Sequence, residues 1–145
     1  MDLNTISLKQ PLNPKIYSDI AEQAADYITP KATFDPRKGK EIIKNRDANK
    51  STQLRKYYDE LLLWHNKIQQ EQGDEARQKK YHDAAPFIQM LKAKVAYAKG
   101  RGHVDENFVE VFNEIIKQID SPQTLRHAKL FYEAMLGYRK ASETK

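Results

Sequence analysis

The sequence predicts an all-α protein, a single-domain bundle of about five helices with a flexible N-terminal arm. Apolar residues recur at spacings of three and four along most of the 145-residue chain, which is the period of an amphipathic helix. No alternating run of β-branched residues competes with that period. Asn-Pro, Ser-Pro and glycine signals punctuate the chain where helices would start and end. The length suffices for one domain with its own core.

The first part of the chain divides into an arm, one helix and an irregular connector. Residues 1–12 show no strong period, so they are expected to form the flexible arm. Asn13-Pro14 predicts a helix start, and apolar residues then recur up to Ile28 before Thr29-Pro30 ends the helix. Residues 31–49 are expected to be a basic connector within the bundle domain of residues 13–141, either mobile or ordered by a ligand. Residues 142–145 are expected to be a tail.

The next helix begins after a predicted turn at residues 47–49. Ser51 or Thr52 is expected to cap it, and apolar residues between Leu54 and Ile68 give it a wide hydrophobic face. The run Leu61–Trp64 is apolar over more than half of the helix circumference. Such a helix is either central to the bundle or buries a second face in a partner.

Helical spacing continues to the end of the chain. Residues 74–85 are charged and helical, and Pro86 is expected to cause a kink or a fresh start. In residues 86–102, PFIQMLKAKVAYAKGRG, one stripe is predicted to be core: Phe87, Ile88, Leu91, Val95 and Ala98. Gly100 and Gly102 are expected to end this helix, Asp105 to cap the next, and Ser121-Pro122 to start the last.

The charge pattern favours an acidic partner. The net charge is +5 and the isoelectric point is about 9.3. Residues 37–56 hold eight basic side chains against two acidic ones, and residues 92–101 hold four basic side chains and no acidic one. Two such clusters favour a nucleic acid over a membrane, since no apolar run approaches membrane-spanning length. The absence of cysteine and of a signal-peptide pattern fits a cytoplasmic protein.

The stretch NKSTQLRKYYDEL is a better candidate for a functional site than the histidines of the chain. A helix N-terminus presents unpaired N–H groups and partial positive charge, so it binds phosphate. Ser51 and Thr52 add hydroxyl donors, Lys50, Arg55 and Lys56 add charge, and the amides of Asn49 and Gln53 could reach a ribose or a phosphate. An ordinary capped core helix would have the same spacing, so both interpretations stay open. A phosphate-binding cap would read no base sequence.

Catalysis and cofactors find little support in the sequence. No two of the four histidines have the i, i+4 spacing of a helical metal site, and each is expected to be a surface or boundary residue. We therefore expect no metal, no cofactor and no enzymatic activity. A small metal-independent ribonuclease using His103 with Lys99 is the weakest alternative. A helical DNA-binding regulator is the stronger one, although its recognition helix would contain mostly alanines between the lysines of residues 92–101.

Two stretches taken together resemble a known family. NKSTQLRKYYDELL, followed about thirty residues later by PFIQMLKAKVAYAKGRG, is similar to the small helical subunit of type III-A CRISPR Csm effector complexes. The C-terminal AKLFYEAMLGYRK resembles that family's last helix. The resemblance covers about Lys50 to Lys140, and the first 45 residues match only loosely.

The resemblance implies a non-catalytic role. Small subunits of this class stack in several copies beside the backbone subunits, line the groove where target RNA pairs with guide RNA, and touch the RNA backbone without reading bases. The implied partners are the backbone and large Csm subunits, copies of the chain itself, guide RNA and target RNA. By position, the RNA-facing residues are Lys50, Ser51, Thr52, Gln53, Arg55, Lys94, Lys99 and Arg101. Lys56 and Lys92 complete the candidate set by charge, and Leu91, Val95 and Tyr97 correspond to core.

Overall fold

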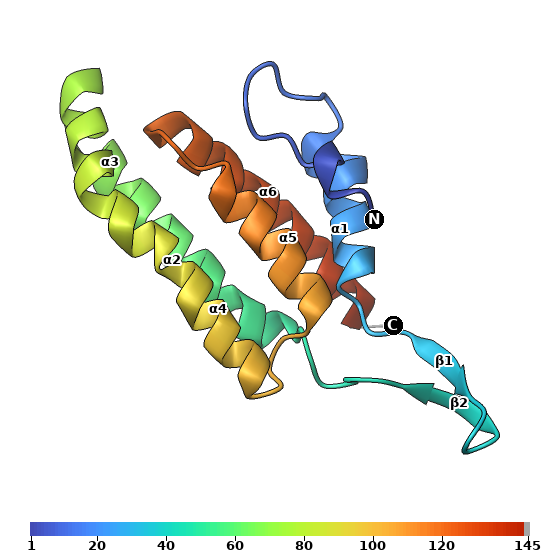
Figure 1. The fold of residues 1–145 in the computed structure, drawn as a ribbon. Coiled ribbons are helices and arrows are strands. Elements are labelled where there is room, and N and C mark those ends of the chain that lie inside the picture. Colours follow the sequence, from blue (N-terminus) through green and yellow to red (C-terminus); the bar gives the residue numbers. More distant parts are fainter. Residues whose placement is uncertain (144–145) are drawn as a thin grey trace.

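The computed structural model describes residues 1–143 and is predominantly helical (Figure 1). Within that range there are six α-helices: α1 (Ala21–Tyr27), α2 (Ser51–Gln69), α3 (Asp74–Gln89), α4 (Leu91–Gly100), α5 (Glu106–Lys117) and α6 (Pro122–Glu143). A 3₁₀ turn, η1 (Leu3–Thr5), and a π-helical segment, η2 (Ile16–Ile20), precede α1. One antiparallel hairpin joins α1 to α2, with strands β1 (Ala32–Asp35) and β2 (Lys40–Ile43).

The helices pack in the order that short connections favour. α6 lies between α1 and α2, and α3 and α4 run back along α2 so that α4 packs against α5. α3 and α4 follow each other with only Met90 between them, and Figure 1 shows them almost as one rod. The expected bundle of about five helices is therefore confirmed. No helix within residues 1–143 combines the length and apolar character needed to span a membrane.

Aromatic rings fill the centre of the bundle. Tyr132 of α6 lies edge-on to Phe108 and Phe112 of α5, with ring centroids 6.4 and 6.1 Å apart. Tyr57 of α2 contacts the same two rings, and the Tyr132 hydroxyl donates to the Leu54 carbonyl at 2.6 Å. Burial raises the pKa of Tyr132 well above its ordinary value. This cluster joins α2, which carries the end of the first basic stretch, to α6 and to α5, on which the α4 helix of the second stretch packs.

Several expected helix signals are confirmed. The Asp105 side chain accepts from the Phe108 N–H, and the Ser121 side chain accepts from the Thr124 N–H. Asn13 instead accepts from the Lys15 N–H in the turn before η2, which begins after Lys15 without a side-chain cap. Gly102 has φ +78° after the end of α4. The His103 N–H donates to the Ala98 carbonyl at 3.0 Å and closes the last turn of α4. This C-terminal cap needs a residue in the left-handed conformation, and Gly102 provides it.

The flexible N-terminal arm is not confirmed. Ile6 and Leu8 are buried in the core. The Leu8 N–H donates to the side-chain oxygen of Gln118 at 2.7 Å, and the Leu8 carbonyl lies 2.7 Å from the ring of the buried His127. Two apolar residues in an extended segment are too few to produce a detectable period, although they bury fully once a groove is available.

Three local expectations were wrong. Residues 32–43 form a hairpin where no strand was predicted, because its strands have four residues each and are largely exposed. Helix α3 continues through Pro86, and the boundary comes four residues later at Met90. Phe87 and Tyr97, both assigned to core, are 51% and 67% exposed. The Trp64 ring of α2 stacks on part of Phe87, and the rest of Phe87 and most of Tyr97 stay exposed.

Candidate nucleic-acid interface

The two basic stretches meet at one end of the bundle. α2 begins where α4 ends, and the N–H of Asn49 donates to the carbonyl of His103 at 3.0 Å (Figure 1). The exposed cations nearest to this contact along the chain are Lys50 on one side and Arg101 on the other. Although fifty residues separate them in the sequence, the fold brings these two positions to the same end.

Asn49 holds that end together. Its backbone has φ +58° and its side chain is completely buried. The side-chain amide donates to the Ile28 carbonyl and to the Asp105 carboxylate, both at 2.8 Å, and its oxygen accepts from the Asp105 N–H at 3.1 Å. The Asn49 carbonyl accepts from Arg139 Nε at 2.9 Å. With the bond to His103, one residue links the ends of α1, α4 and α6 to the starts of α2 and α5. Its amide is therefore not free to reach RNA.

A carboxylate of the chain occupies the N-terminus of α2. The N–H and hydroxyl of Ser51 donate to Glu143 at 2.7 and 2.6 Å, and Arg139 lies 3.6 Å from the same carboxylate. Burial opposes ionisation of Glu143, but the Ser51 hydrogen bonds and the Arg139 charge outweigh it and keep its pKa below the ordinary value. The expected cap by Ser51 or Thr52 was wrong, since the residue before the helix is Lys50 and it makes no side-chain cap. A phosphate at Ser51 would have to displace Glu143.

The remaining polar residues at the start of α2 point to two sides. Thr52 and Arg55 line a groove of about 390 Å³ between α2 and α6, together with Lys140. Tyr58 also lines that groove, and its hydroxyl donates to Glu133. Burial, the larger cause, and this hydrogen bond raise the pKa of Tyr58 to about 12. Gln53 and Lys56, by contrast, contact each other at 3.1 Å on the stripe of α2 that continues to Glu60 and faces α4.

The cations of α4 are also divided. Lys94 pairs with Glu60 of α2 at 2.8 Å, whereas Lys99 pairs with Glu106 at the start of α5. Lys92 is half-buried and is in no ion pair within residues 1–143. Arg101 stacks over the Tyr97 ring at 5.6 Å and donates to the Tyr97 hydroxyl at 3.0 Å.

The ten candidate residues therefore do not line a single groove. They spread over the α2–α6 groove, the α2–α4 seam and the α4–α5 seam, and they approach one another only at the end near Asn49. Four of the ten are paired with a carboxylate at the surface: Lys94 and Lys99 as described above, and Lys50 and Arg55 with Asp47 and Asp59 at 4.0 and 3.9 Å. Exposed pairs contribute about 0–1 kcal/mol, so a phosphate can replace those carboxylates. Their contact with RNA stays a prediction.

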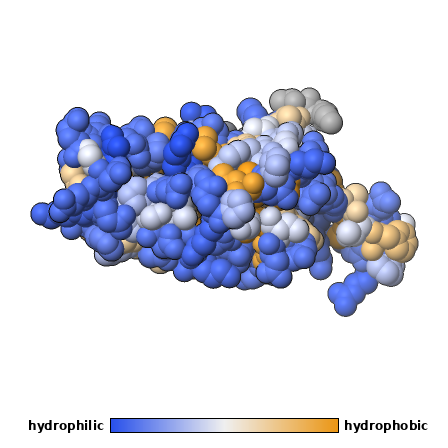
Figure 2. Space-filling model, turned by 90° about the horizontal axis from the view of Figure 1, so that it is seen from above, coloured by the Kyte–Doolittle hydropathy of each residue, from blue (hydrophilic) through white to orange (hydrophobic). Residues whose placement is uncertain are grey.

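An exposed aromatic strip was missed by the sequence reading. Phe87, Met90 and Tyr97 lie at helical spacing along α3 and α4, and all three are exposed. Trp64 of α2 stacks on Phe87 with ring centroids 5.7 Å apart, and the neighbouring Leu63 is 46% exposed. The excess of apolar residues at Leu61–Trp64 was the signal for this strip. In Figure 2 the face seen from above is mostly hydrophilic, with small hydrophobic patches near its middle and on the lobe at the right.

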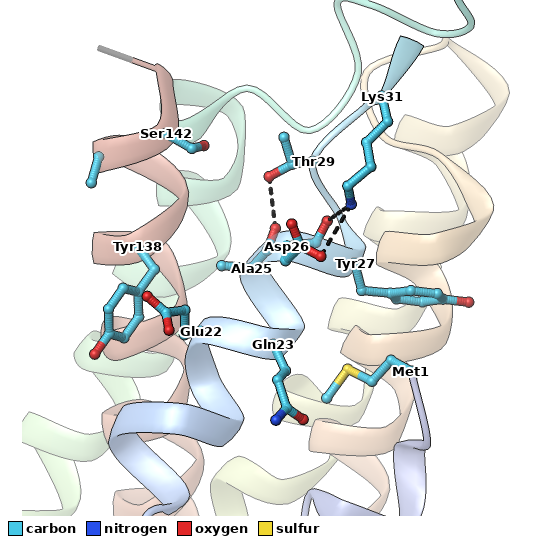
Figure 3. Close-up of a pocket in the computed structure, with 11 residues that line it drawn as sticks. Met1, Glu22, Gln23, Ala25, Asp26, Tyr27, Thr29, Lys31, Tyr138 and Ser142 are labelled. Carbon is cyan, nitrogen blue, oxygen red and sulfur yellow. Dashed lines mark hydrogen bonds and ion pairs between the residues drawn. The ribbon is translucent and has the colours of Figure 1, made fainter. Parts of the chain in front are cut away.

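A cavity on the other side of α6 from α2 has a different character. It has a volume of about 670 Å³, lies between α1 and the C-terminal part of α6, and is drawn in Figure 3. Glu22 and Asp26 provide its acidic groups, and Lys31 is held at its edge by the Asp26 carboxylate at 3.2 Å. Since its cation is already paired and its carboxylates outnumber that cation, this cavity does not suit a polyanion.

The positions proposed for catalysis are not arranged as an acid–base pair. Lys99 contacts Glu106, and His103 is exposed in the turn after α4, where its backbone carbonyl contacts Asn49. Over residues 1–143 no group of three or more His, Asp or Glu side chains is placed to hold a metal ion. His127, expected at the surface or its boundary, is instead buried against the N-terminal segment.

Comparison with known proteins gives one match. A family model described as Csm2 Type III-A matches residues 36–145, which is most of the chain and includes both basic stretches. Searches of curated proteins and of solved structures give no match.

Proposed function

The chain belongs to the Csm2 Type III-A family, so it is a structural subunit of the type III-A CRISPR Csm complex and associates with other Csm subunits. Within that complex, we propose that it binds RNA and stacks in several copies. It is a non-catalytic cytoplasmic subunit that binds the backbones of guide and target RNA without reading sequence. Several copies stack beside the backbone and large subunits of this antiviral complex.

One observation supports the RNA contact most. The hydrogen bond between Asn49 and His103 holds the start of α2 against the end of α4, so that Lys50, Lys99 and Arg101 lie at one end of the bundle. Their surface partners are carboxylates in exposed pairs and the Tyr97 ring, which phosphate oxygens can replace at little cost. Contacts of this kind neutralise phosphates and are indifferent to base identity.

The stacking of copies is supported by the aromatic strip. Leu63, Phe87, Met90 and Tyr97 leave apolar surface exposed along α2, α3 and α4, and a monomer gains nothing from this exposure. A neighbouring subunit that covered the strip would bury these side chains. Linking copies side by side also raises RNA affinity, because each copy contributes only a few phosphate contacts.

The direct test uses the reconstituted complex with charge reversal at Lys50, Arg55, Lys99 and Arg101. Affinity is measured for two target RNAs of unrelated sequence, each with its matching guide. We expect both affinities to fall by the same factor, and the loss to shrink as salt rises, because counterion release from phosphates drives the binding.

The control variant reverses Lys9, Lys15, Lys79 and Lys117, four exposed lysines away from the Asn49 end. It has the same net charge and should bind nearly as well as the unmodified complex. Unchanged affinity in the first variant, or a loss confined to one RNA, would contradict the proposal.

A further inference from the structure

The β1–β2 hairpin stands outside the bundle. Figure 1 shows it projecting from the same end at which α2 begins, and in Figure 2 it forms the lobe on the right. Its strands pair only with each other, and no residue of either strand is fully buried. Two-stranded hairpins are marginally stable alone, so this one gains little from its own contacts. Because the strands pack only on each other, the faces of the hairpin are available to a ligand.

The cations at its tip are free. Arg37, Lys38 and Lys40 lie in and beside the turn, and none of them is in an ion pair within residues 1–143. The carboxylate of Asp35, at the start of the turn, accepts from the Arg37 N–H at 2.9 Å. The Asp35 carbonyl accepts from the Gly39 N–H at 2.8 Å, with Gly39 at φ +64°. Asp35 therefore shapes the turn and leaves the tip positive.

An aromatic ring lies one position before that turn. Phe34 is 63% exposed, one of the largest exposures among the hydrophobic side chains of the chain. It is directly opposite Glu41 in the register of the hairpin. Glu41 disfavours a phosphate next to Phe34, but it does not hinder a base that stacks on the ring. Lys40 is opposite Asp35 and therefore lies on the other face of the hairpin from Phe34, which leaves Arg37 and Lys38 of the turn as the cations that can share a ligand with the ring. An exposed ring close to exposed cations is the combination that binds single-stranded nucleic acid, through stacking and phosphate contacts.

We propose that the β1–β2 hairpin binds single-stranded RNA: Arg37 and Lys38 of the turn contact phosphates, and Phe34 stacks on an unpaired base. This inference rests on the proposed function and adds a second contact to it, away from the helices and selective for unpaired bases. The hairpin leaves the bundle at the end near Asn49, so one strand can run from the helix ends onto the hairpin.

A strand from a protein partner fits the hairpin less well. Adding a strand would require an uncharged, flat edge, whereas Lys31, Lys40 and Lys44 lie in or next to the two strands. Lysines at strand edges oppose pairing with a further strand. The charge of the hairpin therefore favours RNA over β-strand addition.

The first experiment measures binding of full-length protein to a fluorescein-labelled 20-nucleotide poly(U) by anisotropy over a range of salt concentrations. In the variant with Arg37→Gln and Lys38→Gln, we expect the slope of log K against log salt to become shallower by about 1.4, since each phosphate contact on a single strand contributes about 0.7. The matched control, Lys79→Gln with Lys80→Gln on α3, should keep the slope of the unmodified protein.

The second experiment separates stacking from charge. Phe34→Ala should weaken binding to poly(U) by about tenfold, leave the salt slope unchanged, and leave binding to an RNA duplex unchanged, because paired bases offer no free face. Equal losses on both RNAs, or no loss on either, would overturn the stacking contact.

Comparison with the charge reversal at Lys50, Arg55, Lys99 and Arg101 separates the inference from the proposed function. If only the helix-end variant loses poly(U) binding, the hairpin contact is wrong and the proposed function stands. If only the hairpin variants lose it, the helix-end contact is wrong. A hairpin variant that binds RNA normally but no longer co-purifies with other Csm subunits would identify a protein as the occupant and overturn the inference.

Discussion

The two halves of the basic segment at residues 37–56 are used differently. In the hairpin, Arg37, Lys38 and Lys40 are exposed and are in no ion pair with the part of the chain that the structure describes. From Lys50 to Arg55 the cations pair with Asp47 and Asp59, and the helix N-terminus between them is closed by Glu143. The charge is similar in both halves, but one lies on a free surface and the other borders a closed junction.

The cause of the difference lies in what surrounds each half. At the junction, five helix ends converge and leave N–H and C=O groups that must be paired away from water. Asn49, Arg139 and Glu143 pair several of them, and these polar residues are buried or nearly so. The hairpin has no second layer, so nothing there requires its polar groups to be paired within the chain. A charge run therefore indicates a binding surface only where the fold leaves it free.

The largest effect is expected at Asn49, the centre of the junction. Asn49→Ala removes three side-chain hydrogen bonds and places alanine at φ +58°, so stability should fall by roughly 3–5 kcal/mol. Urea unfolding gives the free energy, and the melting temperature should drop by about 10 °C. The control is Asn45→Ala, which has a similar φ of +54° at an exposed site. A loss no greater than that of the control would show that the hydrogen bonds contribute little.

A smaller effect is expected at Glu143. Glu143→Gln weakens the bonds to Ser51 and leaves the buried Arg139 with less compensation, which should cost about 1–2 kcal/mol by urea unfolding. Asp59→Asn is the matched control, because Arg55–Asp59 is also an i, i+4 pair but is largely exposed. That control should lose less than about 0.5 kcal/mol. Equal losses in the two variants would mean that the junction is not protected from water.

The pH dependence of Glu143 gives a third measurement. Its pKa in the folded state is below the ordinary value, so its contribution is fully present above the unfolded-state pKa and is lost as pH falls through the folded-state pKa. The stability difference between the unmodified protein and Glu143→Gln should therefore shrink between about pH 6 and about pH 3. A difference that stayed constant over this range would exclude an ionised Glu143 as its source.

The smallest effect is expected in the hairpin. Phe34→Ser should change the free energy of unfolding by less than about 0.5 kcal/mol, because the ring is largely exposed and contacts no core cluster. Thermal unfolding and far-UV circular dichroism would both stay close to those of the unmodified protein. A loss above about 1 kcal/mol would show that the hairpin packs on the bundle in solution and that its ring is not free for a ligand.

Helical periodicity predicted the parts of the fold in which many residues repeat one pattern. The helices after residue 50 extend over ten or more residues each, and their buried positions follow the predicted stripe at Leu91, Val95 and Ala98. Short segments could not be predicted this way. The N-terminal segment contributes only Ile6 and Leu8 to the core, and each hairpin strand has four residues. Exposure of Phe87 and Tyr97 depends on which flank of a helix has a neighbour, and no local pattern contains that information.

By itself the sequence determined the helical class, most helix starts, the basic character and the family resemblance, because these depend on spacings within one turn or on composition. Only the tertiary structure decided which charges are free. Ser51 meets Glu143 92 positions away, Asn49 meets His103 just after the end of α4, and the Arg37 side chain is in no ion pair within residues 1–143. Pairing between distant side chains follows from how the helices pack, since a charge acts on what lies within a few ångströms of it in space and not along the chain.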